Sequence, residues 1–114
     1  MTTKSFVGII YNKKWGDNEM PATLYKKFER HLGEAEYFRV TIWEVDPSVL
    51  GSQHNFKYSM AYIVDGVCVM RYDNERGKGD HKHIGDQEID TQFVSIEQLF
   101  MDFLADIETI RRGK

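Results

Sequence analysis

The sequence has a single cysteine, Cys68, among its 114 residues. An internal disulfide is therefore excluded, and so is a zinc site built from several thiolates. Because Val67, Val69 and Met70 surround this cysteine, we expect its thiol to be buried in the core and chemically inert.

Long hydrophobic runs are also missing. No segment approaches the roughly 20 apolar residues that a membrane-spanning helix requires. The apolar segment Phe6–Tyr11 is too short for a secretory signal, and no small-residue cleavage site follows it. We therefore expect a cytoplasmic protein that does not engage a membrane.

Charge of one sign is not dominant either. The formal net charge is −3, which argues against a dedicated DNA-binding domain. The acid is concentrated from residue 84 onward, where seven carboxylates accompany three basic side chains, so a locally basic face elsewhere is compatible with the composition. The length allows one domain with one modest hydrophobic core.

The last part of the chain predicts an amphipathic helix. Ser95 and Gln98 have the spacing of a capping box at a helix N-terminus. Arg111 and Arg112 would close the helix, where its dipole favours cations. The apolar residues between these ends recur at helical spacing and would form one stripe that lies on a sheet. They are Ile96, Leu99, Phe100, Phe103, Leu104, Ile107 and Ile110.

A β-hairpin is predicted in the middle of the chain. The segments Asn55–Val64 and Val67–Asn74 flank Asp65-Gly66, a strong signal for a two-residue turn. Such a turn would pair Val64 with Val67, Tyr62 with Val69 and Met60 with Arg71. The period of two places Met70, Tyr72 and Asn74 on one face of the second strand.

A second hairpin is predicted before the first. In Tyr37–Val45, alternation places Phe38, Val40 and Ile42 on one side. Its partner strand would be Thr23–Arg30, connected through a turn at His31–Glu34. A loop is expected at Asp46–Gln53. The predicted fold is α+β, an antiparallel four- to five-stranded meander sheet packed against one C-terminal helix.

We divide the chain into an N-terminal extension, residues 1–20, and a single α+β domain, residues 21–114. Within the extension, Ser5–Tyr11 could form an edge strand and Asn12–Met20 reads as a polar connector.

The segment Arg71–Ile84 carries most of the information about function. We interpret it as a loop, and it combines two histidines, three carboxylates, four cationic side chains and two glycines. Acid–base groups, phosphate-binding groups and backbone freedom therefore occur together, as they do in functional sites.

His81 and His83 allow two chemistries. In an extended backbone, positions i and i+2 project from the same side, so both imidazoles could face one substrate or one ion. In the first chemistry they are general acid and base for RNA cleavage, with Asp73 or Asp80 orienting an imidazole, and no cofactor is expected. In the second, they and one of these carboxylates hold a divalent metal.

Positive charge near the histidines could stabilise the additional charge that develops on phosphorus. Gly77 and Gly79 permit positive φ and would expose backbone N–H groups that cradle a phosphate. The candidate substrate-binding side chains in this segment are Arg71, Arg76, Lys78, Lys82 and Asn74.

A structural interpretation stands beside the functional one. Charged, glycine-containing loops are common, and Asp73 and Asn74 could simply cap a turn. We expect His54 to cap the loop that precedes it or to lie on its surface, and His31 to lie in a solvated hairpin turn.

Several motifs resemble the TumE-type toxins, a family of small bacterial and archaeal proteins found in toxin–antitoxin pairs. The resemblance covers residues 22–112, and its most specific part is Arg71–His83. The matching segments are V-T-I-W-E-V (Val40–Val45), the glycine- and histidine-containing stretch Pro47–Tyr58, Y-I-V-D-G-V-C-V-x-R-Y-D-N-E (Tyr62–Glu75), R-G-K-G-D-H-K-H-I-G (Arg76–Gly85) and F-V-S-I-E-Q-L-F-x-D-F-L-A-D-I (Phe93–Ile107).

The resemblance implies a growth-inhibiting toxin, encoded beside a small helix-turn-helix antitoxin that would neutralise it. Ribonuclease activity is the commonest chemistry among small toxins, so an RNA substrate is expected by class. A non-catalytic partner protein of a helix-turn-helix regulator is the alternative, and a homodimer is left open. The family block contains Arg71, Asp73, Asn74, Lys78, Asp80, His81 and His83.

Overall fold

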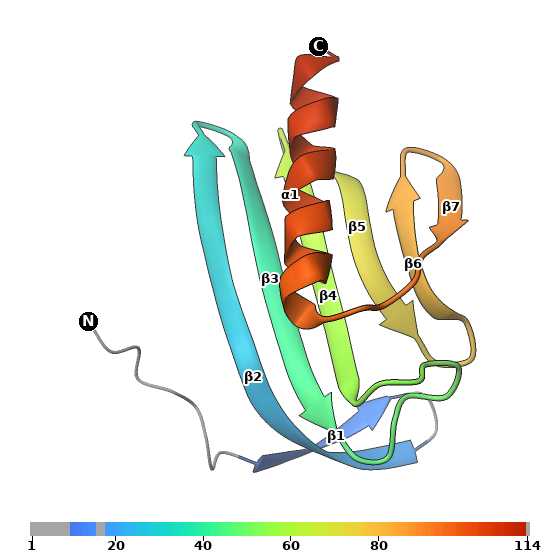
Figure 1. Cartoon of the computed structure of the whole chain (residues 1–114). Helices are drawn as coiled ribbons and strands as arrows, with labels where there is room; N and C mark the ends of the chain where they lie inside the picture. The colour runs from blue at the N-terminus through green and yellow to red at the C-terminus, as the bar shows by residue number, and fades with distance from the viewer. Residues whose placement is uncertain (1–9, 16–17, 114) are drawn as a thin grey trace.

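The computed structural model describes residues 10–15 and 18–113. Within them, seven strands form one antiparallel sheet and pair in sequence order, and a single helix packs on one face of it (Figure 1). The elements are β1 (Ile10–Trp15), β2 (Asn18–Gly33), β3 (Glu36–Val45), β4 (Phe56–Val64), β5 (Val67–Glu75), β6 (Gly79–Ile84), β7 (Gln87–Asp90) and α1 (Ile96–Arg112). The predicted α+β meander with one C-terminal helix is confirmed.

The prediction of four to five strands is too low, chiefly because only residues 76–78 of the expected loop Arg71–Ile84 form a turn, and two further strands follow them. β5 continues to Glu75, the chain turns, and β6 and β7 extend the meander. Polar and charged residues adopt strand here because both hairpins supply their backbone hydrogen bonds, which outweighs a weak intrinsic preference.

The N-terminal part also contains strand. β1 pairs with β2 at one edge of the sheet, so the stretch expected as a connector is strand on both sides of residues 16–17. The first five residues of the expected strand Ser5–Tyr11 lie outside the described part of the chain. In Figure 1, β1 and the adjoining end of β2 run across the bottom of the sheet.

The β4–β5 hairpin has the predicted turn but a different register. Asp65 and Gly66 both have positive φ, 53° and 78°, as a two-residue hairpin turn requires. Val64 pairs with Val67 as predicted, but a bulge after Tyr62 shifts the remaining pairs by one residue, so that Tyr62 faces Met70. The bulge adds one residue to β5 and leaves its buried face unchanged.

The β2–β3 hairpin is longer than predicted. β2 continues through His31 to Gly33, and the turn lies at residues 34–35 instead of His31–Glu34. The alternation of β3 is confirmed, because Phe38, Val40 and Ile42 are buried.

Helix α1 covers the buried face of the sheet. Its Leu99, Phe103 and Ile107 are buried among residues of β3, β4 and β5. The predicted N-cap is confirmed, since the Ser95 hydroxyl accepts a hydrogen bond from the backbone N–H of Gln98 at 3.0 Å. The side chain of Gln98 donates to Asp102 instead of closing the capping box.

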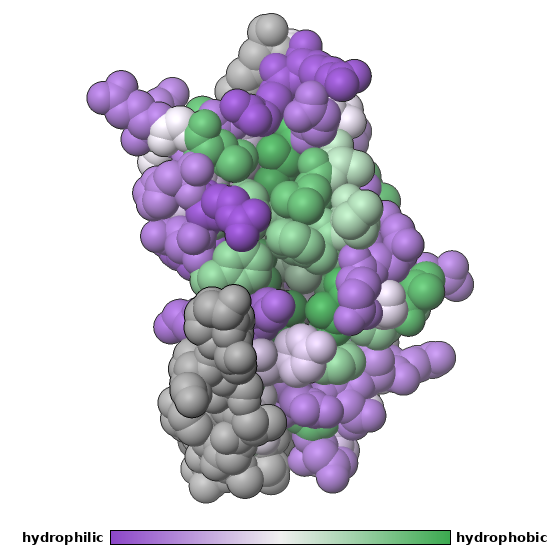
Figure 2. Space-filling view, turned by 60° about the vertical axis from the view of Figure 1, so that its left-hand side comes forward, coloured by the Kyte–Doolittle hydropathy of each residue, from purple (hydrophilic) through white to green (hydrophobic). Residues whose placement is uncertain are grey.

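The helix leaves part of the core at the surface. The view that brings the β2 side forward shows hydrophobic side chains gathered on the upper part of that face, with hydrophilic ones around them (Figure 2). Phe28 of β2 and Phe100 of α1, whose ring centroids are 5.9 Å apart, are partly buried hydrophobic residues of this core. No helix within the described residues is long and apolar enough to cross a membrane.

The prediction that Cys68 is buried is wrong, because its thiol is exposed. Residues 65–67 of the neighbouring turn are exposed as well, so this end of the hairpin extends beyond the core.

Candidate functional site

The pairing of β5 with β6 assembles the candidate site. Asp73 faces His81 directly across the two strands, and Arg71 faces His83. Directly opposed residues of an antiparallel pair project from the same side of the sheet. Tyr72, which lies between Arg71 and Asp73, packs its ring against Phe103 of α1. The four opposed side chains therefore lie on the face away from the helix.

Three of these side chains converge on one point. Nε2 of His81 lies 2.8 Å from Oδ1 of Asp73, and the rings of His81 and His83 have centroids 4.9 Å apart. One ligand atom from each of Asp73, His81 and His83 lies within 4.8 Å of the other two. We call these residues the Asp73–His81–His83 cluster. The predicted same-side projection of the two imidazoles is confirmed.

The imidazole of His81 is fully buried, with no exposed surface. Its Nδ1 lies 3.0 Å from the carbonyl oxygen of Gly79, which can only accept, so Nδ1 carries the hydrogen. In a neutral ring, Nε2 then presents a lone pair toward the Asp73 carboxylate. Among the residues that the structure describes, no hydrogen-bond partner is present for three buried atoms: Nε2 of His81, Nε2 of His83 and Oδ1 of Asp73.

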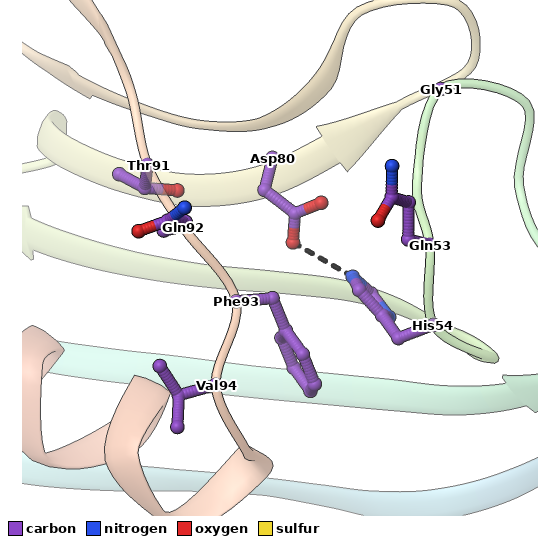
Figure 3. A pocket seen from close by; sticks show the side chains of 8 residues that line it. All are labelled: Gly51, Gln53, His54, Asp80, Thr91, Gln92, Phe93 and Val94. Carbon is purple, nitrogen blue, oxygen red and sulfur yellow. Dashed lines mark hydrogen bonds and ion pairs between the residues drawn. The ribbon is translucent and has the colours of Figure 1, made fainter.

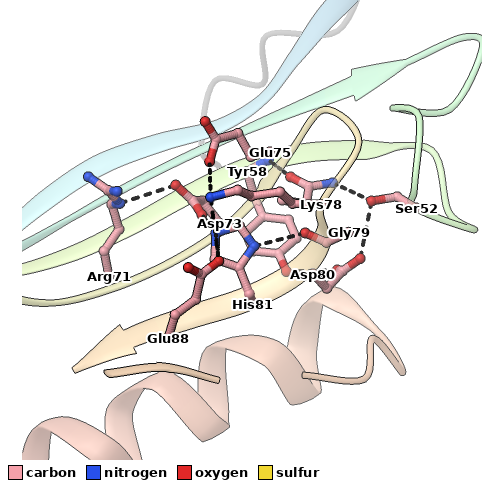
Figure 4. Close-up of polar contacts among 11 residues, drawn as sticks. Ser52, Tyr58, Arg71, Asp73, Glu75, Lys78, Gly79, Asp80, His81 and Glu88 are labelled. Carbon is pink, nitrogen blue, oxygen red and sulfur yellow. Dashed lines mark hydrogen bonds and ion pairs between the residues drawn. The ribbon is translucent and has the colours of Figure 1, made fainter. Parts of the chain in front are cut away.

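Charged groups surround Asp73 and His81, as Figure 4 shows. Arg71 Nε lies 3.1 Å from Oδ2 of Asp73, whereas His81 contacts the other oxygen, Oδ1. Glu88 of β7 lies 3.8 Å from His81 Nε2 and 3.6 Å from the ammonium of Lys78. The site therefore contains a buried acceptor cluster with two cations at its edge.

Two neighbours of the cluster were missed by sequence reasoning. Glu88 reaches it because β7 pairs with β6, and Lys57 of β4, two strands away from His81, interacts electrostatically with Asp73. Burial lowers the pKa of the Lys57 ammonium, against the opposing effects of Asp73 and Glu75. Only strand register could have identified these residues, because Glu88 lies outside the matching segments and Lys57 lies in one, Pro47–Tyr58, that is distant in sequence from the two histidines.

The remaining predicted site residues lie elsewhere. Lys82 projects toward α1, where its ammonium lies 2.8 Å from Asp106. Arg76 is exposed in the β5–β6 turn. Asp80 and Asn74 form a facing pair whose contacts are with the loop before β4. The structure thus brings Arg71, Asp73, His81 and His83 together, with Lys78 at the edge, and separates the others from them.

Asp80 is the centre of a second polar network. Its carboxylate accepts hydrogen bonds from Ser52 at 3.1 Å and from the Tyr58 hydroxyl at 2.7 Å, and lies 2.8 Å from His54 Nε2. Burial alone would raise the pKa of Asp80, but the hydrogen bonds from His54, Tyr58 and Ser52 outweigh it and lower the pKa. Burial, followed by the bond to Asp80, raises the pKa of Tyr58.

This network holds the 46–55 loop against β6. His54, expected as a loop decoration, has only 10% of its side chain exposed and stacks on Phe93 with ring centroids 3.8 Å apart. The two rings and Asp80 line a surface pocket (Figure 3). Nδ1 of His54 accepts from the backbone N–H of Phe56, so both ring nitrogens are engaged and the residue is structural.

The backbone N–H groups of the β5–β6 turn bind carbonyl groups of the protein, one of them in this loop, and are not free to bind a phosphate. Gly77 and Gly79 have positive φ as predicted, but the N–H of Gly77 donates to the carbonyl of Leu50 and that of Lys78 to Glu75. A Cβ on Gly51 would lie 2.9 Å from the backbone nitrogen of Gly79, so the two segments touch. The interpretation of these N–H groups as a phosphate cradle is wrong.

Comparison with known proteins identifies one family. The family model described as Toxin TumE matches residues 16–111. No curated protein and no solved structure matches the chain. The match includes the whole β5–β6 hairpin and all of α1 except its last residue, Arg112. The chain therefore belongs to the TumE toxin family.

Proposed function

We propose that this protein is the toxin of a toxin–antitoxin pair and that it inhibits growth by cleaving RNA at the Asp73–His81–His83 cluster. The observation that carries the proposal is the convergence, beside exposed cations, of three buried polar atoms that make no hydrogen bond within the described part of the chain. A buried polar atom without a partner is destabilising, and such atoms persist mainly where function requires them.

The groups at the cluster match the demands of phosphodiester cleavage. A proton must leave the attacking oxygen, the leaving oxygen must be protonated, and the additional negative charge on phosphorus must be stabilised. Arg71 and Lys78 each have about half of the side chain exposed, 45% and 53%, so they can reach a phosphate while they border the cluster. His83 is partly exposed and is the imidazole that an RNA strand can reach.

The buried position of His81 limits what it can do. Because Nδ1 is bound to Gly79, only Nε2 is available, and it faces Asp73. His81 is therefore better suited to hold another group in place than to exchange protons with solvent. Acid–base catalysis by His81 and His83 is therefore less favoured than the other chemistry considered for these residues, the binding of a divalent metal.

The test combines growth inhibition on induced expression with cleavage of a labelled RNA by purified protein, with and without added divalent ions. We expect His83→Ala and Asp73→Asn to lower the cleavage rate by about 100-fold or more. His31→Ala is the matched control, because it removes an imidazole that is 63% exposed and far along β2. Thermal melts confirm that each variant is folded.

Two results would overturn the proposal. One is wild-type protein that inhibits growth without cleaving RNA under any of these conditions. The other is unchanged toxicity in both cluster variants. If a helix-turn-helix protein then co-purifies with the chain, and cluster variants lose only that binding, the non-catalytic partner role is supported instead.

A further inference from the structure

We infer that the Asp73–His81–His83 cluster is a binding site for one divalent transition-metal ion. The proposed ligand atoms are Oδ1 of Asp73, Nε2 of His81 and Nε2 of His83. Two imidazoles and one carboxylate form a common ligand set for such ions. The inference deepens the proposed function, on which the catalytic role of the ion rests, while metal binding itself can be measured separately.

The first argument concerns lone pairs. The hydrogen of His81 is on Nδ1, so the 2.8 Å contact between Nε2 and the carboxylate oxygen brings two acceptors together. A positive centre between or beside them is required to offset this repulsion. One additional proton on His81 would satisfy that contact alone. Nε2 of His83 adds a third lone pair when the hydrogen of that ring is on Nδ1, and a cation can then satisfy all three at once.

The second argument concerns distance. Ligands at about 2.0–2.1 Å from one ion, separated by a right angle, lie about 2.8–3.0 Å from each other. The contact between His81 and Asp73 has this length, and His83 is within 4.8 Å of both partners without any change in backbone. A modest rotation of the partly exposed His83 ring would complete the set.

The third argument concerns the groups behind the ligands. Metal-binding imidazoles usually donate their other N–H to a carbonyl or carboxylate, which fixes the ring orientation. His81 does this through Gly79, and the second oxygen of Asp73 is held by Arg71 at 3.1 Å. Glu88, 3.8 Å from His81 Nε2, places a second carboxylate beside the site.

The ligand set favours some ions over others. Imidazole nitrogen suits Zn²⁺ or Fe²⁺ better than Mg²⁺ or Ca²⁺, which prefer oxygen, and the carboxylate of Asp73 also suits Mn²⁺. Three protein ligands leave coordination positions open for solvent or for a phosphate oxygen, so a bound ion could act as a Lewis acid on the substrate.

The experiment measures binding before activity. Protein stripped with EDTA is dialysed against Mn²⁺ and, separately, against Zn²⁺, and bound metal is counted and titrated by calorimetry. We expect one ion per chain, and at least tenfold weaker affinity in Asp73→Asn and in His83→Ala. His31→Ala should bind like the wild type. In electron paramagnetic resonance spectra, the signal of protein-bound Mn²⁺ should disappear in Asp73→Asn and His83→Ala and remain in His31→Ala.

The outcomes separate this inference from the proposed function. If neither ion binds, or if binding is the same in folded Asp73→Asn and His83→Ala as in wild type, the metal site is refuted. RNA cleavage that persists in EDTA would then leave the proposed function standing with acid–base chemistry. One-to-one binding that depends on the cluster, in a protein that cleaves no RNA, would support the metal site and refute the proposed function.

Discussion

At the scale of single residues, burial separates the histidines by role. His81 is fully buried and has one nitrogen free of main-chain contacts, whereas His54 has both nitrogens engaged. His31 is exposed on β2 beside Glu29. The spacing in the sequence identified His81 and His83 as a pair. It could not distinguish a histidine of a functional site from one that only stabilises the fold.

Asp80 provides a prediction at this scale. Replacing it by alanine leaves the Tyr58 hydroxyl, Ser52 and His54 without their shared acceptor in a mostly buried position. We expect Asp80→Ala to lower the free energy of unfolding by about 2–4 kcal/mol. Urea denaturation at neutral pH measures the change.

Asp86→Ala is the control for this prediction, because Asp86 is exposed in the β6–β7 turn and should change stability by less than about 0.5 kcal/mol. An Asp80→Ala variant as stable as this control would show that the network contributes little.

At the scale of elements, the β5–β6 hairpin decides which residues meet. A one-residue change in its register would move His81 and His83 to the helix side. The turn and the contacts of the 46–55 loop hold that register, because Gly77 donates to Leu50 and Asp80 binds three residues of the loop and β4. The loop therefore supports the cluster from the opposite face of the same strands.

The attachment of α1 to the sheet provides a pH prediction. Glu36 of β3 accepts from the Tyr62 hydroxyl and lies 2.9 Å from Nε of Arg111 at the end of the helix. Burial, followed by the hydrogen bond to Glu36, raises the pKa of Tyr62 from 10.0 to about 12. The folded state therefore favours the protonated phenol.

A pKa that is higher in the folded state than in the unfolded state stabilises the fold. This stability is complete below the pKa of the unfolded state and is lost as pH rises toward the pKa of the folded state. Between pH 9 and pH 11 the wild type should lose about 1.4 kcal/mol of unfolding free energy through Tyr62. Tyr62→Phe lacks this loss, so its stability curve should be flatter by that amount, in urea titrations at several pH values. Parallel curves for the two proteins would contradict the assignment.

At the scale of the whole molecule, one core joins the sheet to its helix. Phe103 is completely buried and contacts the rings of Phe38 and Tyr72 from two strands. We expect Phe103→Ala to lower the free energy of unfolding by about 3–5 kcal/mol and to abolish toxicity through loss of folded protein. Chemical denaturation and soluble yield measure the two effects.

Met101 is the matched control on the same helix, because it is 62% exposed. Met101→Ala should change stability by less than about 0.5 kcal/mol and leave toxicity unchanged. Equal losses in the two variants would mean that α1 does not depend on the core contact at Phe103.

Elements whose signals are local could be predicted from the amino-acid sequence alone. The helix with its Ser95 cap, the Asp65-Gly66 turn and the buried alternation of β3 depend on neighbouring residues, and all were predicted. Family membership was also visible in the Arg71–His83 motif.

Features that depend on strand register and on contacts between distant segments became visible only in the folded chain. The bulge after Tyr62, the strand character of Arg71–Ile84, and the approach of Glu88 and Lys57 to the cluster all follow from pairing between strands. The same pairing turns Lys82 and Asp80 away from His81, although they are its neighbours in sequence. Alternation across a strand sends consecutive side chains to opposite faces, and only the packed fold gives each face its partners.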